Sequence, residues 1–226
     1  MLAEILPPQV AVAEAVEDPP QAALFPEEEE RIARAVPSRQ REFGTGRWCA
    51  RQALAALGQP PVAIPSGARG APSWPDGITG SITHCAGYRA AAVARAQDVE
   101  SIGVDAEPNE PIPGDVLRLV ADDAERAWVT ELLAAAPAVS WDRLLFSAKE
   151  SVYKAWYPLT GRWLDFSEAS LTVDAAARTF AARLLVPATR PDGRPLAGFT
   201  GRWLARDGLL VTVIVLPRAG GADDAG

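Results

Sequence analysis

Two stretches decide the fold: Gly103-Val104-Asp105-Ala106-Glu107 and, further along the chain, Phe146-Ser147-Ala148-Lys149-Glu150-Ser151-Val152-Tyr153-Lys154-Ala155-Trp156. In the first, an apolar run typical of a buried strand stops at two acids at i and i+2, which share one face of an extended chain. The second repeats its apolar residues at helical spacing, so Glu150 and Lys154 lie together on the opposite face. Three carboxylates and a lysine brought together would suit a hard cation beside a phosphate. The sequence thus predicts Mg-assisted chemistry on a phosphoric anhydride.

The composition is that of a soluble globular protein. Its 226 residues, 48% hydrophobic and 23% charged, can bury one large core or two small ones. A net charge of −7 argues against nucleic-acid binding, which needs a basic face. The apolar runs are too short for a membrane span, and the amino terminus lacks the pattern of a secretory signal. We therefore expect a cytoplasmic protein whose two cysteines, Cys49 and Cys85, are buried and unpaired.

The amino-terminal half is expected to form helices followed by strands. Residues 1–26, rich in Ala, Pro and Glu, are expected to be loosely ordered. The acids at 27–30 indicate the solvated first turn of a helix that reaches about residue 36. Ser38 is the expected cap of a longer helix that ends at Gly58. Strands are expected at residues 78–84, 90–96 and 101–105, the last two apolar enough to be central.

The proline-rich stretch 108–114 is the candidate crossing between two halves. It separates an amino-terminal lobe at residues 27–110 from a carboxy-terminal lobe at 111–217, and a disordered tail is expected at 218–226. The second lobe is expected to have helices at 115–120, 122–135 and 140–157, the last stopped by Pro158. Strands are expected at 167–174, 179–186, 201–206 and 209–216, with a hairpin turn at Asp207-Gly208. Because helices precede strands in each half, the fold class is α+β.

Both deciding stretches resemble the signature motifs of the 4′-phosphopantetheinyl transferases. Val-Asp-Ala-Glu at residues 104–107 and Ala-Lys-Glu-Ser-Val-Tyr-Lys-Ala-Trp at 148–156 are similar to those of the surfactin/enterobactin-type (type II) branch. Arg47-Trp48-Cys49-Ala50-Arg51 and Gly80-Ser81-Ile82-Thr83-His84-Cys85 bring the chain closest to the actinobacterial, mycobacterial-type enzymes. The resemblance implies two similar α/β lobes related by a pseudo-twofold, with the active site between the lobes.

The resemblance also implies roles for the charged residues of the two motifs. Asp105, Glu107 and Glu150 match the metal-binding acids, for Mg²⁺ or for Mn²⁺ in its place. Glu150 doubles as the base for a serine hydroxyl, and Lys154 contacts the pyrophosphate and stabilises the leaving group. Taken alone, the acids at 105–107 would be a solvated strand end, and Lys154 a helical partner of Glu150. Lys149 faces elsewhere on the helix and is given only a weak supporting role.

Positions that bind coenzyme A follow from the same resemblance. The segment with Ser81, Thr83 and His84 looks like the family's Ser-X-Ser-His motif, with Thr83 in place of a serine. His84, the single histidine of the chain, would contact a phosphate of coenzyme A. The basic residues Arg47, Arg51 and Arg69 are assigned to its 3′-phosphate end, with Arg69 at a position where relatives commonly have lysine. Without the resemblance, these arginines would be solvated charges and His84 a structural histidine.

The implied activity is Mg-dependent transfer of 4′-phosphopantetheine from coenzyme A to a serine of an apo acyl or peptidyl carrier protein, releasing adenosine 3′,5′-bisphosphate. Holo-[acyl-carrier-protein] synthases of this kind serve fatty-acid, polyketide or nonribosomal-peptide systems. Two alternatives stay open: an Mg-dependent hydrolase of a nucleotide pyrophosphate and a non-catalytic coenzyme A binding protein.

The expected partners are carrier proteins, with no nucleic acid and no membrane. A monomer is expected because one chain holds both halves of the site. For carrier docking, we expect an apolar patch flanked by arginines within residues 115–133, built from Leu117, Arg118, Val120 and Arg126. The simpler alternative is that its apolar members belong to the core.

Overall fold

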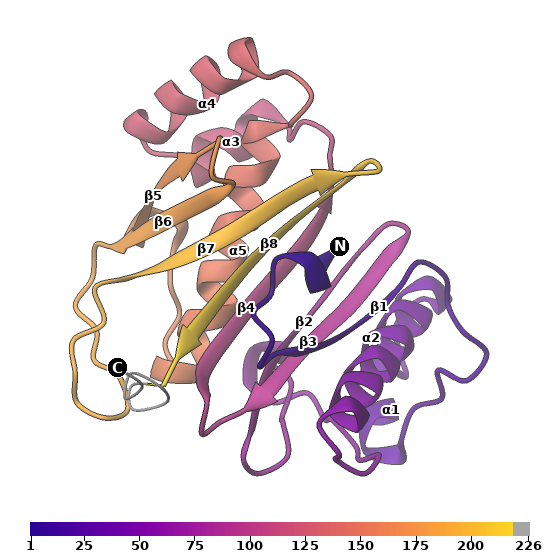
Figure 1. The fold of residues 1–226 in the computed structure, drawn as a ribbon. Coiled ribbons are helices and arrows are strands. Elements are labelled where there is room, and N and C mark those ends of the chain that lie inside the picture. The colour runs from indigo at the N-terminus through magenta and orange to yellow at the C-terminus, as the bar shows by residue number, and fades with distance from the viewer. Residues whose placement is uncertain (219–226) are drawn as a thin grey trace.

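The computed structural model describes residues 1–218, in which two antiparallel sheets each carry one long helix (Figure 1). The first sheet has the order β1-β3-β2 and the second the order β4-β8-β7-β6-β5. The strands are β1 Ala11–Ala15, β2 Ile78–Cys85, β3 Tyr88–Arg95, β4 Val99–Pro108, β5 Ala169–Asp174, β6 Thr179–Leu184, β7 Gly198–Arg206 and β8 Leu209–Pro217. The helices are α1 Pro26–Ile32, α2 Pro37–Ala56, α3 Gly114–Val120, α4 Asp123–Ala135 and α5 Trp141–Thr160. This confirms the α+β class with two lobes.

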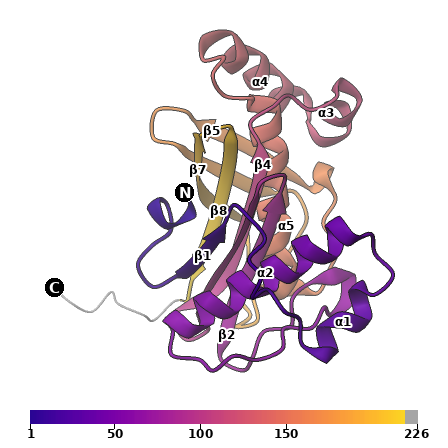
Figure 2. The same cartoon turned by 90° about the vertical axis from the view of Figure 1, so that its right-hand side faces the viewer.

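The first lobe is built on β3, whose small apolar residues let α2 pack closely. Figure 2 looks onto α2 as it lies across the first sheet. Ala50 and Leu54 of α2 pack in one cluster with Ala91 and Val93 of β3. Both cysteines are free, which confirms that prediction, although Cys85 is only half-buried.

Residues 1–26 are more ordered than expected, because they contain β1. This strand pairs with β3 from Ala11 opposite Val93 to Ala15 opposite Arg89. Its side chains are small enough to pack against α2, and the backbone bonds to β3 fix the segment. The expectation of loose order was therefore wrong for these residues.

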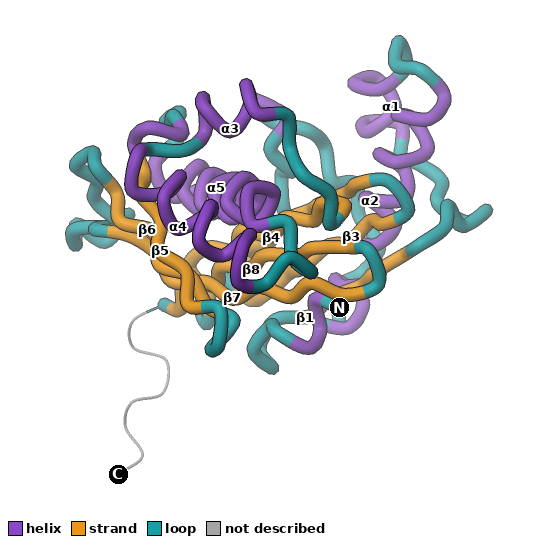
Figure 3. The backbone as a smooth tube through the Cα atoms, turned by 90° about the horizontal axis from the view of Figure 1, so that it is seen from above, coloured by secondary structure: helices purple, strands orange, loops and turns teal. Residues whose placement is uncertain are grey.

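The second lobe packs α5 against one face of its sheet. Seen from above, α3 and α4 lie on the same side of that sheet as α5 (Figure 3). The apolar stripe expected from helical spacing is buried, with Trp141 and Trp156 near its two ends. Pro158 does not stop the helix. The helix continues to Thr160 and ends at Gly161, whose φ of 63° is the left-handed conformation of a helix C-cap.

Three further features differ from the expectation: the start of α2, the place of β4 in its sheet and the crossing between the lobes. Ser38 lies inside α2, whose N-cap is Val36 and whose first residue is Pro37. β3 is central in its sheet, as expected, but β4 is an edge strand that, within residues 1–218, pairs with β8 alone. The chain therefore passes between the two sheets just before β4 and not at residues 108–114. Of the predicted tail at 218–226, all but residue 218 lie outside the described residues.

Two hydroxyl groups join the edges of the two sheets. The backbone N–H of Val104 in β4 donates to the Ser81 hydroxyl of β2 at 3.2 Å, and that of Ala106 donates to the Thr83 hydroxyl at 2.9 Å. We call this junction of β2 and β4 the seam.

Within residues 1–218, no helix has both the length and the apolar character to cross a membrane.

Candidate active site

The site begins where β4 approaches α5 most closely. Asp105 and Glu107 share the face of β4 that looks toward α5, as the strand period predicts. Gly103, on the same face, permits the contact, since a Cβ there would lie 2.0 Å from the Ser151 carbonyl oxygen. Lys154 then donates to Asp105 Oδ1 at 2.7 Å and to the Val104 carbonyl at 3.0 Å. The predicted meeting of these two motifs is present in the structure.

Glu107 is held by an arginine from the start of α5. Arg143 Nη1 lies 2.9 Å from Glu107 Oε2, and the same guanidinium donates to the carbonyls of Glu110 and Pro111. Burial raises the pKa of Glu107, with the negative charge of Asp105 as the next cause, while Arg143 opposes the rise. Arg143 was not among the predicted site residues.

Glu150 opens onto a cleft of about 490 Å³ between the lobes. Lys154, Tyr153, Trp74 and Arg69 line the same cleft. Burial raises the pKa of the Glu150 carboxyl, and Asp105 adds to the rise, whereas Lys154 lowers it. Across residues 1–218, no hydrogen bond or ion pair engages this carboxylate. Glu150 is therefore available to a substrate.

Two of the three predicted acids have oxygens that fit a divalent cation. Among the described residues, no three His, Cys, Asp or Glu side chains are grouped closely enough to hold a metal ion by themselves. Asp105 Oδ2, however, is buried without a hydrogen-bond partner. Because Mg²⁺ usually takes only one or two protein oxygens, this atom and the carboxylate of Glu150 fit its donor preference. The metal roles of Asp105, Glu107 and Glu150 stay predictions.

A second hollow, of about 370 Å³, continues the cleft toward α2. The two share Gly70, Pro72 and Ile82 in their walls. The basic residues that line the second hollow are Arg31, Arg39, Arg47 and His84. Two adjoining hollows therefore lie between the Glu150 carboxylate and a group of basic residues, with one acid, Glu42, also in the lining.

Arg47 is buried and held in place from two sides. It donates to the Ile64 carbonyl at 2.8 Å and to the Ser66 hydroxyl at 3.0 Å, and its guanidinium lies over the Phe43 ring at 4.1 Å. Burial lowers its pKa to about 10, which still leaves it charged at neutral pH. A charge fixed in this way is suited to an anion.

His84 faces Arg39, whose Nη1 lies 2.5 Å from His84 Nε2. Burial lowers the pKa of His84 to about 4, with the positive charge of Arg39 as the next cause. The neutral imidazole therefore accepts a hydrogen bond from Arg39. Arg39 was not among the predicted site residues, although its spacing of eight residues from Arg47 places both on one side of α2.

Of the remaining residues predicted to bind coenzyme A, some line the cleft and some bond to the backbone of β4. Exposed Arg69 lines the cleft, with its guanidinium 5.3 Å from the centre of the Trp163 ring. Ser81 also lines the cleft, but its hydroxyl and that of Thr83 accept backbone N–H groups across the seam. Their predicted contact with coenzyme A is untested.

Arg51 is turned into the first lobe. It donates to both oxygens of Glu28, at 2.9 and 3.0 Å, and to the Ala23 carbonyl at 2.6 Å. It lines neither hollow of the cleft. Glu28, expected to be solvated in an acidic first turn, is instead fully buried and also accepts the backbone N–H of Ile64 at 2.7 Å. The expectation of a solvated acid was wrong at this residue.

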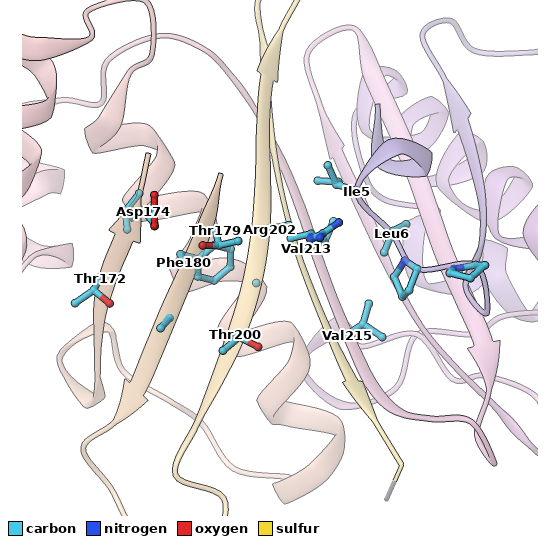
Figure 4. A pocket seen from close by; sticks show the side chains of 15 residues that line it. Ile5, Leu6, Thr172, Asp174, Thr179, Phe180, Thr200, Arg202, Val213 and Val215 are labelled. Atoms are coloured by element: carbon cyan, nitrogen blue, oxygen red, sulfur yellow. The ribbon is translucent and has the colours of Figure 1, made fainter. Parts of the chain in front are cut away.

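A larger hollow, of about 800 Å³, lies elsewhere. It is on the outer face of the second sheet, between the strands and the amino-terminal residues Ile5 and Leu6 (Figure 4). Thr200 and Arg202 of β7 and Val215 of β8 contribute to its lining. None of the predicted site residues lines it, so its size does not mark it as the active site.

Comparisons with known proteins agree with this geometry. Residues 27–94 match the 4′-phosphopantetheinyl transferase N-terminal domain, and residues 101–200 match the 4′-phosphopantetheinyl transferase superfamily. The chain is 56% identical to the 4′-phosphopantetheinyl transferase Svp of Streptomyces mobaraensis, over 100% of this chain and 93% of that protein. It is 50% identical to Npt of Nocardia iowensis, over 95% and 99%, and 47% identical to PptT of Mycobacterium tuberculosis, over 96% and 98%. The chain therefore belongs to the 4′-phosphopantetheinyl transferases, which transfer phosphopantetheine from coenzyme A to carrier proteins.

Proposed function

We propose that this enzyme is Mg-dependent and transfers 4′-phosphopantetheine to the serine hydroxyl of an apo acyl or peptidyl carrier protein in the cytoplasm, acting as a monomer. The observation that carries the proposal is the pair of adjoining hollows, with Glu150 and Lys154 lining one and Arg39, Arg47 and His84 lining the other. Coenzyme A has a pyrophosphate and a separate 3′-phosphate, and this separation suits charges divided between two regions of a cleft.

The basic end of the cleft binds and orients the substrate. Arg39 and Arg47 supply positive charge for the 3′-phosphate, and Arg69 adds charge from the adjoining hollow. Neutral His84, which accepts from Arg39, donates a hydrogen bond to the phosphate through its other ring nitrogen. The pyrophosphate then lies near Lys154, whose ammonium group is positioned by Asp105 and the Val104 carbonyl. Asp105 and Glu150 would hold Mg²⁺, and Glu107, the third predicted ligand, is paired with Arg143 in this structure. When bound, the ion would supply positive charge to the pyrophosphate.

The chemical step is a phosphoryl transfer to the carrier serine. The serine oxygen forms a bond to the phosphorus that carries the pantetheine arm, and the bond from that phosphorus to the bridging pyrophosphate oxygen breaks. Glu150 takes the hydroxyl proton, a role favoured because its raised pKa brings it closer to that of an effective base at neutral pH. Lys154 stabilises the negative charge on the departing adenosine 3′,5′-bisphosphate.

Intact-mass measurement of the carrier tests this function directly. Apo acyl and peptidyl carriers incubated with the enzyme, coenzyme A and Mg²⁺ should each gain the mass of one phosphopantetheine. Glu150→Gln is expected to reduce this gain about a hundredfold or more, while coenzyme A still binds in calorimetry. Glu17→Gln, at an exposed position between β1 and α1, is the matched control. Free phosphopantetheine with no modified carrier would indicate the alternative, a pyrophosphate hydrolase.

The carrier-docking patch needs one correction. Val120 is buried and belongs to the core, whereas its neighbour Leu119 is 78% exposed, beside exposed Arg118 on α3. We therefore place the apolar centre of the patch at Leu119. Leu119→Glu should raise the KM for the carrier without changing that for coenzyme A, and Leu185→Glu, at an exposed leucine that follows β6, should change neither.

A further inference from the structure

Lys149, the residue before Glu150, is buried on the side of α5 away from the cleft. Its side chain is 3% exposed, and its ammonium group has three acceptors. These are the Val120 carbonyl at the end of α3 at 2.7 Å, Glu125 Oε2 of α4 at 2.8 Å, and the Phe166 carbonyl at 2.8 Å. An ammonium group has three N–H donors, so all of them are used. Lys149 thus connects α5 to three separate segments.

Its partner Glu125 extends the same connection. Glu125 is fully buried, and its other oxygen accepts the backbone N–H of Leu171 in β5 at 2.8 Å. It also accepts the backbone N–H of Asp122 at 2.7 Å, within the capping box that starts α4. The charge of Lys149 is therefore matched by a carboxylate whose own position is fixed by the backbone.

Unlike Lys149, Glu150 has a side chain that no partner within residues 1–218 holds in place. Within residues 1–218, no hydrogen bond or ion pair restrains its carboxylate, so its place depends on the backbone of α5 and on the groups around it. A small hollow of about 90 Å³ adjoins it, lined by Lys149, Trp163 and Phe166. Residues 163–166 also line that hollow, and the Phe166 carbonyl of this segment accepts a hydrogen bond from Lys149.

We propose that Lys149 is a positioning residue: by fixing both α5 and the wall formed by Trp163 and Phe166, it sets where the Glu150 carboxylate lies in the cleft. This assigns Lys149 more than the weak supporting role expected from the sequence, and it rests on the proposed role of Glu150. The predicted consequence is a loss of turnover with little change in coenzyme A affinity, because the basic end of the cleft does not depend on Lys149.

The test compares turnover with ligand affinity in two variants. Lys149→Met alone would leave Glu125 as a buried unpaired charge, so the first variant combines Lys149→Met with Glu125→Gln. The second, Lys149→Arg, keeps a charge for Glu125, but its planar fork cannot serve the same three acceptors. Circular dichroism identifies which of the two variants fold. In each folded variant, kcat should fall about tenfold to a hundredfold, as expected for a misplaced catalytic group, while the Kd for coenzyme A changes less than about twofold.

Two controls make the outcomes distinct. Arg190→Met breaks the ion pair with Glu100 in the same lobe and should lower the melting temperature without lowering kcat. Glu150→Gln, measured in parallel, tests the proposed function itself. If Glu150→Gln is inactive while a folded Lys149 variant turns over normally, only the positioning role is overturned. Equal losses of kcat and coenzyme A affinity in the Lys149 variants would also overturn it, because they would indicate damage to the whole cleft.

Discussion

Single charged residues in this enzyme are held by specific partners before any substrate is present. Asp105 is paired with Lys154 and Glu107 with Arg143. These pairs keep carboxylates and their counter-charges within one small region, while Glu150 has no such partner within residues 1–218. A reacting group left without a partner beside a set of paired charges is consistent with the role of Glu150 as the base.

His84 should titrate far below the usual range for histidine. Its pKa of about 4 is below the ordinary value of 6.5, so the folded protein favours the neutral imidazole. His84 therefore contributes stability that is present above pH 6.5 and is lost as the pH falls toward 4. Because the chain has one histidine, its NMR resonances can be followed without assignment. A midpoint near pH 6.5 in the free enzyme would contradict the buried, neutral state.

Arg51 should matter more for folding than for coenzyme A. Arg51→Met leaves the fully buried carboxylate of Glu28 without its charged partner, so we expect the free energy of unfolding to fall by about 3–5 kcal/mol. Chemical denaturation measures this change. The double variant with Glu28→Gln should recover part of the loss. A stable Arg51→Met protein with weakened coenzyme A binding would instead support the 3′-phosphate contact implied by family resemblance.

The motifs predicted the meeting of Asp105 with Lys154 because both periodicities are local properties of the chain. Strand alternation sets the face of β4, and helical spacing sets the face of α5. The fate of Glu28 could not be predicted in the same way. Its neighbours are also glutamates, and only the arrival of Arg51 and the Ile64 backbone from distant segments decides which acid is buried.

Among the elements, the contact between α5 and the second sheet determines the site. Three hydroxyl residues, Ser147, Ser151 and Thr212, form a buried hydrogen-bonded group between α5 and β8. Beside it, Gly103 allows the backbone of α5 to approach β4 directly. The height of α5 above the sheet, and with it the distance from Lys154 to Asp105, is therefore set by small side chains.

Gly103→Ala should separate these two elements. The added Cβ would lie 2.0 Å from the Ser151 carbonyl and 2.9 Å from the Ala155 nitrogen, both in helical backbone that cannot rotate away. We expect a loss of about 3 kcal/mol or more in the free energy of unfolding, measured in denaturant. Gly114→Ala is the matched control, because its Cβ would meet nothing closer than 3.9 Å. Equal stability of the two variants would show that the contact is not tight.

The sequence predicted the type of most elements but not their membership of a sheet. Asp207-Gly208 is a hairpin turn as expected, with both residues at positive φ. A strand was expected at residues 101–105, and the structure extends it to Val99–Pro108. Its pairing with β8 depends on residues more than a hundred positions away. Short β1 was missed because alanine, which supplies three of its five residues, has a low strand propensity, and the segment is held as a strand by its bonds to β3.

Taken as a whole, the molecule shares one part of its core between the lobes. Ala90 and Ala92 of the first sheet pack in the same cluster as Val104 of β4 and Val211 of β8. The cleft lies between the same two lobes, with Trp74 from one side and Tyr153 from the other. A shared core and a shared cleft should make the two lobes respond together.

We therefore expect a single unfolding transition that coenzyme A moves to higher temperature. At a coenzyme A concentration a hundred times its Kd, ligand linkage adds about 2.7 kcal/mol to the free energy of unfolding. Dephospho-coenzyme A at the same concentration should shift the midpoint less, because it lacks the 3′-phosphate that Arg39 and Arg47 are proposed to bind. Differential scanning calorimetry measures both shifts. Two separate transitions, only one of them moved by the ligand, would show that the lobes unfold independently.

The seam also has a consequence for solubility. β2 and β4 are both edge strands, and an unprotected edge offers free N–H and C=O groups to which a strand of another chain can add. Here the hydroxyls of Ser81 and Thr83 occupy two of these N–H groups on β4, and Lys154 occupies the Val104 carbonyl. The side chains that assemble the cleft thus also block intermolecular strand addition, so an enzyme that loses them risks aggregation as well as inactivity.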